Sequence, residues 1–359
     1  MAPQKGCFGA LNRRTGKLCS PVANGAREYH RWRPPLNPQL DLFGGLPSPD
    51  PAPRVDCPAG NDARLLDIAS RLPPQVRLGT SSWAFSGWAG VVYDRSLPER
   101  VLSREGLAAY ARHPLLRTVG LDRTFYAPLG EDEYRRHAEQ VPAGFRFLVK
   151  APQSLTTAWL FETREASPHF LDPGAARDLF VAPCLAGLGA AAGPLVFQFP
   201  PQGRSVTREP AAFAARLQRF LRDLPRGPTY AVELRDRELL APETMRALGD
   251  AGARLCLGVH ARMPAVQVQA AAATALGAGP LVIRWNLHAG FGYEEAKSRY
   301  APFDRLVDED PATRLAIAGL CRDCVARGDE AWVIANNKAE GSAPLTLERL
   351  ALAILEGAG

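Results

Sequence analysis

The sequence predicts a (β/α)8 barrel of the TIM-barrel type, preceded by a mostly disordered leader. From residue 61 onward, eight short β-branched runs alternate with helix-like segments, which is the pattern of a closed barrel. The runs are nearly continuously apolar, as is typical of parallel strands covered on both faces. Residues 1–60 show almost no such periodicity. We therefore expect a leader over residues 1–60 and a single barrel domain over residues 61–359.

The expected elements follow one another in a regular order. The strands are expected at residues 75–81, 117–122, 145–150, 194–199, 229–234, 254–259, 280–285 and 331–336. The helices are expected at residues 104–112, 131–139, 209–222, 242–251, 264–277, 310–327 and 344–356. Asp310-Pro311 and Ser342-Ala343-Pro344 mark two helix starts, because proline suits the first helical turn. An open doubly wound sheet is the competing fold, but no GxGxxG follows the first run.

The leader is rich in residues that do not build a core. It holds ten of the 32 prolines and seven glycines, so it cannot bury enough apolar surface to offset its ordering entropy. With eight Lys/Arg and four Asp/Glu it carries +4 of the net charge of +6, which leaves about +2 for the barrel. The barrel is therefore not a strongly basic nucleic-acid binder, although the leader could add a weak, salt-sensitive attraction to an anion.

Several classes of protein are disfavoured by the composition. No run of 18 apolar residues occurs, and the first residues lack the hydrophobic region of a secretory signal, so we expect no membrane span. The seven cysteines are odd in number and scattered, which fits a cytoplasmic location. Cys321 and Cys324 form a CxxC inside an amphipathic helix, where structural cysteines are favoured over a metal site. His260 and His288 are the strand-end histidines, without metal-ligand spacing.

Polar side chains at the strand ends are the best functional evidence, since barrel enzymes carry their chemistry where strands end and loops begin. Lys150 ends the third expected strand and Glu233 lies at the end of the fifth. A carboxylate near a lysine serves as acid or base if burial tunes either pKa, so these two are the candidate catalytic residues. A structural buried ion pair would present the same two residues.

Four strand-end cations could converge on a bound anion, namely Lys150, Arg235, Arg284 and Lys338. Arg284 and the helix start at Ser342 flank the seventh and eighth strands, the usual phosphate position in such barrels. Alternatively, one or two of these cations pair with strand-end carboxylates, of which the candidates are Glu233, Asp236 and Asp122. The remaining polar candidates for substrate binding are Gln198, Asn336 and Asn337.

Aromatic residues follow the first two strands. Trp83, Phe85 and Trp88 come after the first strand, and Phe125 and Tyr126 after the second. Together they would form a wall suited to a flat ring, a sugar face or a nucleobase. Some of them must belong to the core, and the candidates for substrate contact are Trp83, Trp88 and Tyr126.

Short blocks of sequence occur in a recognisable order. GTSSWAFSGWAGVVY extends from Gly79 to Tyr93. It is followed by TFY (124–126), FRFLVKAP (145–152), LVFQFPP (195–201), AVELR (231–235), IRW (283–285) and ANN (335–337). These blocks resemble the YecE-like family (domain of unknown function 72), whose signature opens with a GTSGWxYxxWxGxFY-like run. The resemblance implies a TIM-barrel-like fold from about Val76 to Leu355 and no particular reaction, because the family has no settled activity.

The chain departs from this family pattern at three places. Gly120 and Leu121 stand before TFY where an acidic residue is expected, and Thr157 and Asp236 stand where the family tends to have histidines. If those positions serve chemistry elsewhere in the family, this chain has altered or lost it. The matching residues, which imply that a pocket persists, are Lys150, Glu233, Arg284, Asn336 and Asn337.

The leader contains one apolar motif within NPQLDLFGG, at residues 37–45. Its centre resembles the pentapeptide by which bacterial replication and repair proteins dock on the β sliding clamp, and consists of Gln39, Leu40, Asp41, Leu42 and Phe43. A short extended peptide inserts such apolar side chains into pockets, while glutamine and backbone groups supply polar contacts. Two alternatives stay open: the apolar side chains plug the bottom of the barrel, or the match arises by chance.

Two functions of different classes agree with these features. In the first, the barrel is an enzyme, of hydrolase or phosphodiester type, that acts on an anionic or nucleotide-like small molecule or on DNA. The clamp motif would then recruit it to DNA under replication or repair. In the second, the barrel is a non-catalytic module that binds a ligand or a partner. The sequence identifies no cofactor.

Overall fold

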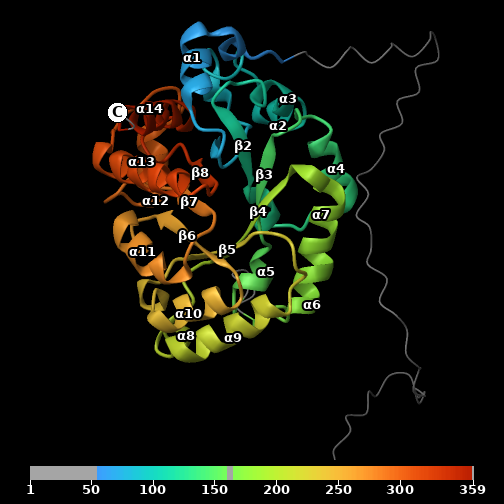
Figure 1. The fold of residues 1–359 in the computed structure, drawn as a ribbon. Helices are drawn as coiled ribbons and strands as arrows, with labels where there is room; N and C mark the ends of the chain where they lie inside the picture. The colour runs from blue at the N-terminus through green and yellow to red at the C-terminus, as the bar shows by residue number, and fades with distance from the viewer. Residues whose placement is uncertain (1–54, 160–164, 358–359) are drawn as a thin grey trace, which may run out of the picture. The chain divides into compact units, whose positions relative to one another are not determined.

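The computed structural model describes residues 55–159 and 165–357, and in this part of the chain eight parallel strands close into a barrel. Each strand pairs with its neighbours in sequence and β8 pairs with β1, so the predicted (β/α)8 barrel is confirmed (Figure 1). The strands are β1 (Val76–Thr80), β2 (Leu116–Leu121), β3 (Arg146–Lys150), β4 (Ala192–Phe199), β5 (Tyr230–Leu234), β6 (Arg254–Val259), β7 (Leu281–Trp285) and β8 (Ala331–Ala335). All eight coincide with the expected runs.

Helices connect successive strands and cover the outside of the barrel (Figure 1). They are α1 (Ala63–Arg71), α2 (Glu99–Glu105), α3 (Leu107–Tyr110), α4 (Glu131–Ala138), α5 (Gln153–Thr156), α6 (Pro173–Ala176), α7 (Ala182–Leu188), α8 (Arg204–Thr207), α9 (Pro210–Arg222), α10 (Pro242–Asp250), α11 (Val266–Ala273), α12 (Tyr293–Tyr300), α13 (Pro311–Ala326) and α14 (Ala343–Glu356). The expected helix at 104–112 is divided into α2 and α3. Six helices lie outside the expected ranges, namely α1, α5, α6, α7, α8 and α12. For α5, α6 and α8 the reason is that four residues are too few for a helical period to be visible in the sequence.

The two expected helix starts are confirmed, with different caps. At α13 the Asp310 carboxylate accepts a hydrogen bond from the Thr313 N–H at 3.0 Å, and Pro311 is the first helical residue. At α14, Ser342 stands at the cap position but makes no capping bond with its side chain. The Ala343 N–H instead donates to Oδ1 of Asn337, at 2.8 Å.

The barrel domain extends further toward the N-terminus than residue 61. Val55, Cys57 and Ala59 are buried in its main core, so these residues belong to the folded body. The apolar motif at residues 39–43 lies outside the described residues, and its role stays a prediction. In the described ranges, we find no helix whose length and apolar character would let it cross a membrane.

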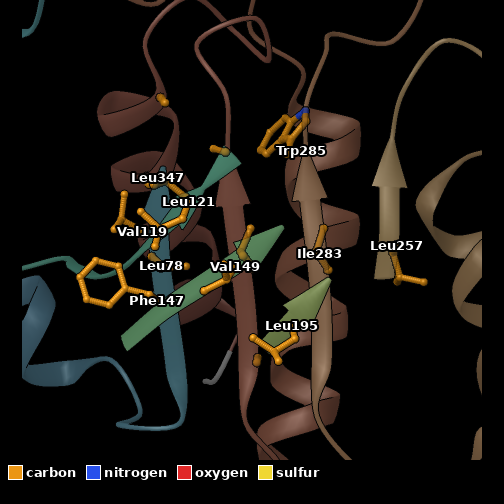
Figure 2. Packing of buried hydrophobic residues seen from close by; sticks show 14 of the residues in the cluster. Leu78, Val119, Leu121, Phe147, Val149, Leu195, Leu257, Ile283, Trp285 and Leu347 are labelled. Carbon is orange, nitrogen blue, oxygen red and sulfur yellow. The ribbon is translucent and has the colours of Figure 1, made fainter. Parts of the chain in front are cut away.

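The strands separate two regions of apolar packing. Successive side chains of a strand point to opposite faces of the sheet. One set, which includes Phe147 and Val149 of β3, packs in the same cluster as Leu347 of α14 (Figure 2). The intervening set forms a second cluster inside the barrel, made of Leu148, Val196, Ala231, Cys256, Val282, Trp332 and Ile334. This inner cluster supports the polar residues that follow it on each strand.

Candidate functional site

The predicted strand-end residues come together above the inner cluster. Side chains two residues apart on a strand share a face. The residues two positions after Leu148, Val196, Ala231, Val282 and Ile334 therefore also face the barrel axis, and they are Lys150, Gln198, Glu233, Arg284 and Asn336. We refer to these five residues as the polar layer. Gln198 is directly in register with Glu233 on the neighbouring strand, which places the two side chains next to each other.

Glu233 is the centre of a buried ion-pair network. Its Oε2 accepts a hydrogen bond from Nη1 of Arg284 at 2.6 Å, and its Oε1 lies 2.5 Å from Nη2 of Arg235. Nδ2 of Asn286 donates to the same Oε1 at 3.2 Å. The other end of the Arg284 guanidinium donates to Asp122, so two carboxylates alternate with two arginines. We refer to Asp122, Arg284, Glu233 and Arg235 as the ion-pair network.

This geometry decides between the two roles left open for Arg284. Its side chain is 2% exposed, and both of its terminal nitrogens are engaged by carboxylates. Burial alone would lower the pKa of Arg284, but the adjacent carboxylates of Asp122 and Glu233 raise it above its usual range. The charge of Arg284 is thus balanced inside the protein. The pairing alternative describes both terminal nitrogens of Arg284, which are engaged by carboxylates of the protein.

The protonation of Glu233 follows from the same neighbours. Complete burial acts to raise the pKa of Glu233, but the positive charges of Arg235 and Arg284 outweigh it and hold the pKa at about 2. Glu233 therefore stays ionised at neutral pH. Gly258 leaves space for this carboxylate, since a Cβ added at Gly258 would lie 3.2 Å from Oε1 of Glu233.

Lys150 differs from Arg284, the other cation of the polar layer, because it has no partner of opposite charge at bonding distance. Its Nζ makes no ion pair or hydrogen bond with any described residue and lies 3.6 Å from the centre of the Phe125 ring. Burial lowers the pKa of Lys150 to about 7, against the opposing effect of Asp122. Both protonation states are therefore populated at neutral pH, which suits a group that moves a proton.

His260 stands at the end of β6, next to the ion-pair network. Burial, together with the positive charge of Arg235, lowers the pKa of His260 to about 4, so its imidazole is neutral at pH 7. The backbone N–H of Arg262 donates to Nδ1 at 3.3 Å, which places the remaining ring proton on Nε2. His260 therefore adds a neutral hydrogen-bond donor at the mouth of the barrel.

The two asparagines that end β8 have separate roles. Asn336 donates from Nδ2 to Oγ of Ser81 at 2.8 Å, and its Oδ1 accepts from Nζ of Lys338 at 3.1 Å. It is half-buried and remains part of the polar layer. Asn337 is buried, and its Oδ1 accepts from Nε1 of Trp88 and from the backbone of α14. The predicted substrate contact of Asn337 is replaced by this capping role.

The aromatic residues do not form one continuous wall. Trp83 and Trp88 are both buried in the main core, where Nε1 of Trp83 donates to the Leu102 carbonyl at 3.0 Å. Their indole nitrogens are satisfied inside the protein, so the two tryptophans are core residues rather than ligand contacts. Tyr126 is 77% exposed, with its ring edge-on against Phe125. Phe125 contacts the polar layer through Nζ of Lys150, which lies over its ring.

The departures from the family pattern have local structural roles. A Cβ at Gly120 would lie 3.2 Å from the Cα of Ser81, so little space exists for a side chain there. Thr157 is buried after α5. Asp236 accepts a hydrogen bond from the backbone of Gln202 at 2.7 Å, and burial raises its pKa.

In residues 55–159 and 165–357, no three His, Cys, Asp or Glu side chains are grouped as metal ligands would be.

Two residues of the site were not among the predicted binding residues. Asp122 follows β2 directly and Asn286 follows β7, and both bond to members of the ion-pair network. Their position just beyond a strand end was the available signal. From that position Asp122 was named as a possible partner of a strand-end cation, which is the role it has here. The signal is shared by many loop residues, so Asn286 was not singled out.

Comparison with known proteins supports the fold. The chain is similar to the crystal structure of a DUF72 family protein from Enterococcus faecalis V583, at 17% identity and a TM-score of 0.53, over 78% of this chain and 95% of that chain. It is also similar to a DUF72 family protein from Thermotoga maritima MSB8, at 18% identity and a TM-score of 0.50, over 79% of this chain and 98% of that one. No curated protein matches. A family model described as "Protein of unknown function DUF72" matches residues 77–357, and the chain therefore belongs to the DUF72 family.

Proposed function

We propose that the carboxyl end of the barrel is the active site of an enzyme that acts on a phosphate-bearing or nucleotide-like substrate, with Lys150 as the proton-transfer group. The observation that carries this proposal is a buried, unpaired amine whose pKa is about 7, set among fixed charges. Such tuning of a lysine near the operating pH is a property of general acids and bases.

The other residues of the polar layer act around Lys150. In its neutral form Lys150 accepts a proton from a substrate hydroxyl or a bound water, and in its charged form it returns that proton to the leaving group. Glu233, which stays ionised, is in this proposal a positioning residue that holds Arg284 and Arg235 in place. Gln198 and Asn336 have amide groups facing the same side and are the residues proposed to hydrogen-bond the substrate.

We further propose that residues 39–43 recruit the barrel to the β sliding clamp, and so to DNA under replication or repair. The support is the sequence of the motif together with a barrel interior that is already filled by its own inner cluster. A binding role for the closely spaced Leu40, Leu42 and Phe43 is therefore the simpler account of why the proline-rich leader keeps them.

The catalytic proposal is tested by screening the purified full-length chain against phosphodiester, abasic and nucleotide substrates. Any activity found should fall at least about a hundredfold in Lys150→Met. It should also rise with pH through a midpoint near 7 when the neutral amine is the active form. An activity that Lys150→Met leaves intact contradicts the assignment. Lys297→Met, which removes an exposed lysine on α12, is the matched control.

The clamp proposal has an independent test. The full-length chain and its Leu42→Ala/Phe43→Ala double variant are titrated with purified β clamp. Loss of binding in the double variant is expected, because these side chains would fill the apolar pockets of the clamp. Equal affinity of both proteins, or no binding by either, rejects the proposal. Leu11→Ala/Phe8→Ala, elsewhere in the leader, controls for a general effect of removing apolar side chains.

One observation favours the alternative of a non-catalytic binding module. Glu233, the other candidate catalytic residue, has both oxygens engaged by Arg284, Arg235 and Asn286, as in a purely structural network. If the screen detects tight ligand binding without turnover, and Lys150→Met leaves that binding unchanged, the module is the better description.

A further inference from the structure

A second polar site lies next to the polar layer, at the carboxyl ends of β4, β5 and β6. It is an open cavity of about 430 Å³, within the range of about 300–1,000 Å³ that is usual for small-molecule sites. The loops after these strands supply four arginines to its wall: Arg204, Arg235, Arg237 and Arg262. We refer to this cavity as the arginine pocket.

The arginine pocket has an excess of positive charge. Arg235 is already paired with Glu233, so the three remaining guanidinium groups face the carboxylates of Asp236 and Glu238, which leaves a formal charge of about +1 at the wall. Asp236 is already engaged by the backbone of Gln202. The side chains of Arg204, Arg237 and Arg262 form no ion pair or hydrogen bond with any residue in the described ranges. Like charges gathered in one concave site favour the binding of an anion that compensates them.

Arg235 connects the arginine pocket to the ion-pair network. Its Nη2 lies 2.5 Å from Glu233, while its Nε is buried and has no hydrogen-bond partner. The ion pair with Glu233 holds the Arg235 guanidinium in place at the wall of the arginine pocket. A ligand bound here would lie beside His260, whose pKa responds to both Arg235 and Arg262.

We propose that the arginine pocket binds the dianionic phosphate of a phosphate monoester, and so holds the phosphate end of the substrate whose reacting part reaches Lys150. The placement of the reacting part of the substrate at Lys150 rests on the proposed function, whereas the phosphate site is argued from the arginine pocket alone. Guanidinium groups match phosphate oxygens bidentately. A monoester carries close to two negative charges at pH 7 and an internal phosphodiester carries one, so a monoester is attracted more strongly by the unpaired guanidinium groups.

This position differs from the one expected from sequence. Phosphate sites in such barrels usually lie after strands 7 and 8. Here Arg284 of β7 is enclosed by Asp122 and Glu233, whereas Arg204, Arg237 and Arg262, which follow β4, β5 and β6, make no ion pair with a described residue.

Calorimetric titration of the full-length chain at one fixed salt concentration tests the phosphate site. Thymidine 5′-monophosphate is expected to bind at least tenfold more tightly than thymidine, a difference of about 1.4 kcal/mol. The Arg237→Gln/Arg262→Gln double variant should lose at least this factor, and the fold is not at risk because both side chains are exposed and unpaired. Arg246→Gln, an exposed arginine of α10 outside the pocket, should change affinity less than about twofold.

Oligonucleotides with and without a 5′-phosphate distinguish two possible sources of the phosphate. A short single-stranded oligonucleotide that binds more tightly with a 5′-phosphate than without one supports a DNA end, and preference for the free nucleotide supports a small molecule. Equal binding of thymidine and its monophosphate, an unaffected double variant, or binding of inorganic phosphate alone overturns the proposal. If the phosphate site is confirmed while Lys150→Met keeps full turnover, the proposed function fails and the arginine pocket remains.

Discussion

Lys150→Met is the perturbation that most directly examines the candidate site. Methionine keeps most of the volume of the side chain and removes its amine. Burial lowers the pKa of Lys150 from 10.5 to about 7, and each pKa unit corresponds to about 1.36 kcal/mol between the two protonation states. Charging this lysine in the folded protein therefore opposes folding by several kcal/mol, on the order of 4–5 kcal/mol at full protonation.

The sign of the pH dependence follows from proton counting. Between pH 7 and 10.5 the unfolded chain binds a proton on Lys150 that the folded chain has mostly released. The free energy of unfolding of the wild type therefore rises with pH in this window, relative to the variant. At pH 9, two units above the pKa of Lys150 in the folded protein, the free energy of unfolding of the wild type has risen by about 2 kcal/mol from its value at pH 7. The stability advantage of Lys150→Met over the wild type is therefore largest at and below pH 7.

Guanidinium unfolding followed by tryptophan fluorescence measures this difference at pH 6, 7, 8 and 9. Lys297→Met is the control, because the side chain of Lys297 is 59% exposed and its removal does not empty a buried site. The reasoning is refuted if the difference between wild type and Lys150→Met stays constant within about 0.5 kcal/mol over this range. Such a result would mean that Lys150 remains charged in the folded protein and cannot supply a neutral amine at pH 7.

Three further predictions concern the support of the site. Gly79→Ala should destabilise the barrel by about 3 kcal/mol in chemical unfolding, because the new Cβ would lie 2.0 Å from the Thr118 carbonyl oxygen. Gly130→Ala, with nothing within 4 Å of its Cβ, should change stability by less than about 1 kcal/mol. Arg284→Met should cost about 3–5 kcal/mol by leaving Glu233 unpaired on one side, and adding Glu233→Gln should recover part of that cost in a double-mutant cycle. Asn337→Ala should cost about 1–3 kcal/mol in thermal or chemical unfolding and leave ligand affinity unchanged, since it removes the cap of α14 and the partner of Trp88.

The fold was predictable because its signal is repeated along the chain. Eight apolar runs of strand length, separated by helical segments, each contribute the same evidence, so an error at one element does not change the topology. Helices α1, α5, α6, α7, α8 and α12, each of nine residues or fewer, were not among the expected helices, and the division between α2 and α3 was missed. These details depend on a few local backbone contacts and leave no periodic pattern.

The membership of the polar layer was also largely predictable. Lys150, Gln198, Glu233, Arg284 and Asn336 were all selected as strand-end residues, and the two-residue repeat of a strand brings them onto one face. The same reasoning failed for Asn337, Trp83 and Trp88. Their side chains find hydrogen-bond partners within the core, and a sequence does not show which way a loop residue turns.

By itself, the sequence determined the barrel and the ring of polar residues at its carboxyl end, because these follow from repeated runs and from alternation along single strands. It also determined the family, through short blocks of residues in a fixed order. Only the tertiary structure decided which charges neutralise one another. Arg284 is held between carboxylates from β2 and β5, Lys150 is left unpaired with a pKa of about 7, and three arginines after β4, β5 and β6 are left facing a cavity. Pairing of this kind depends on distances of a few ångströms between residues far apart in the chain, and burial then multiplies the effect of each charge.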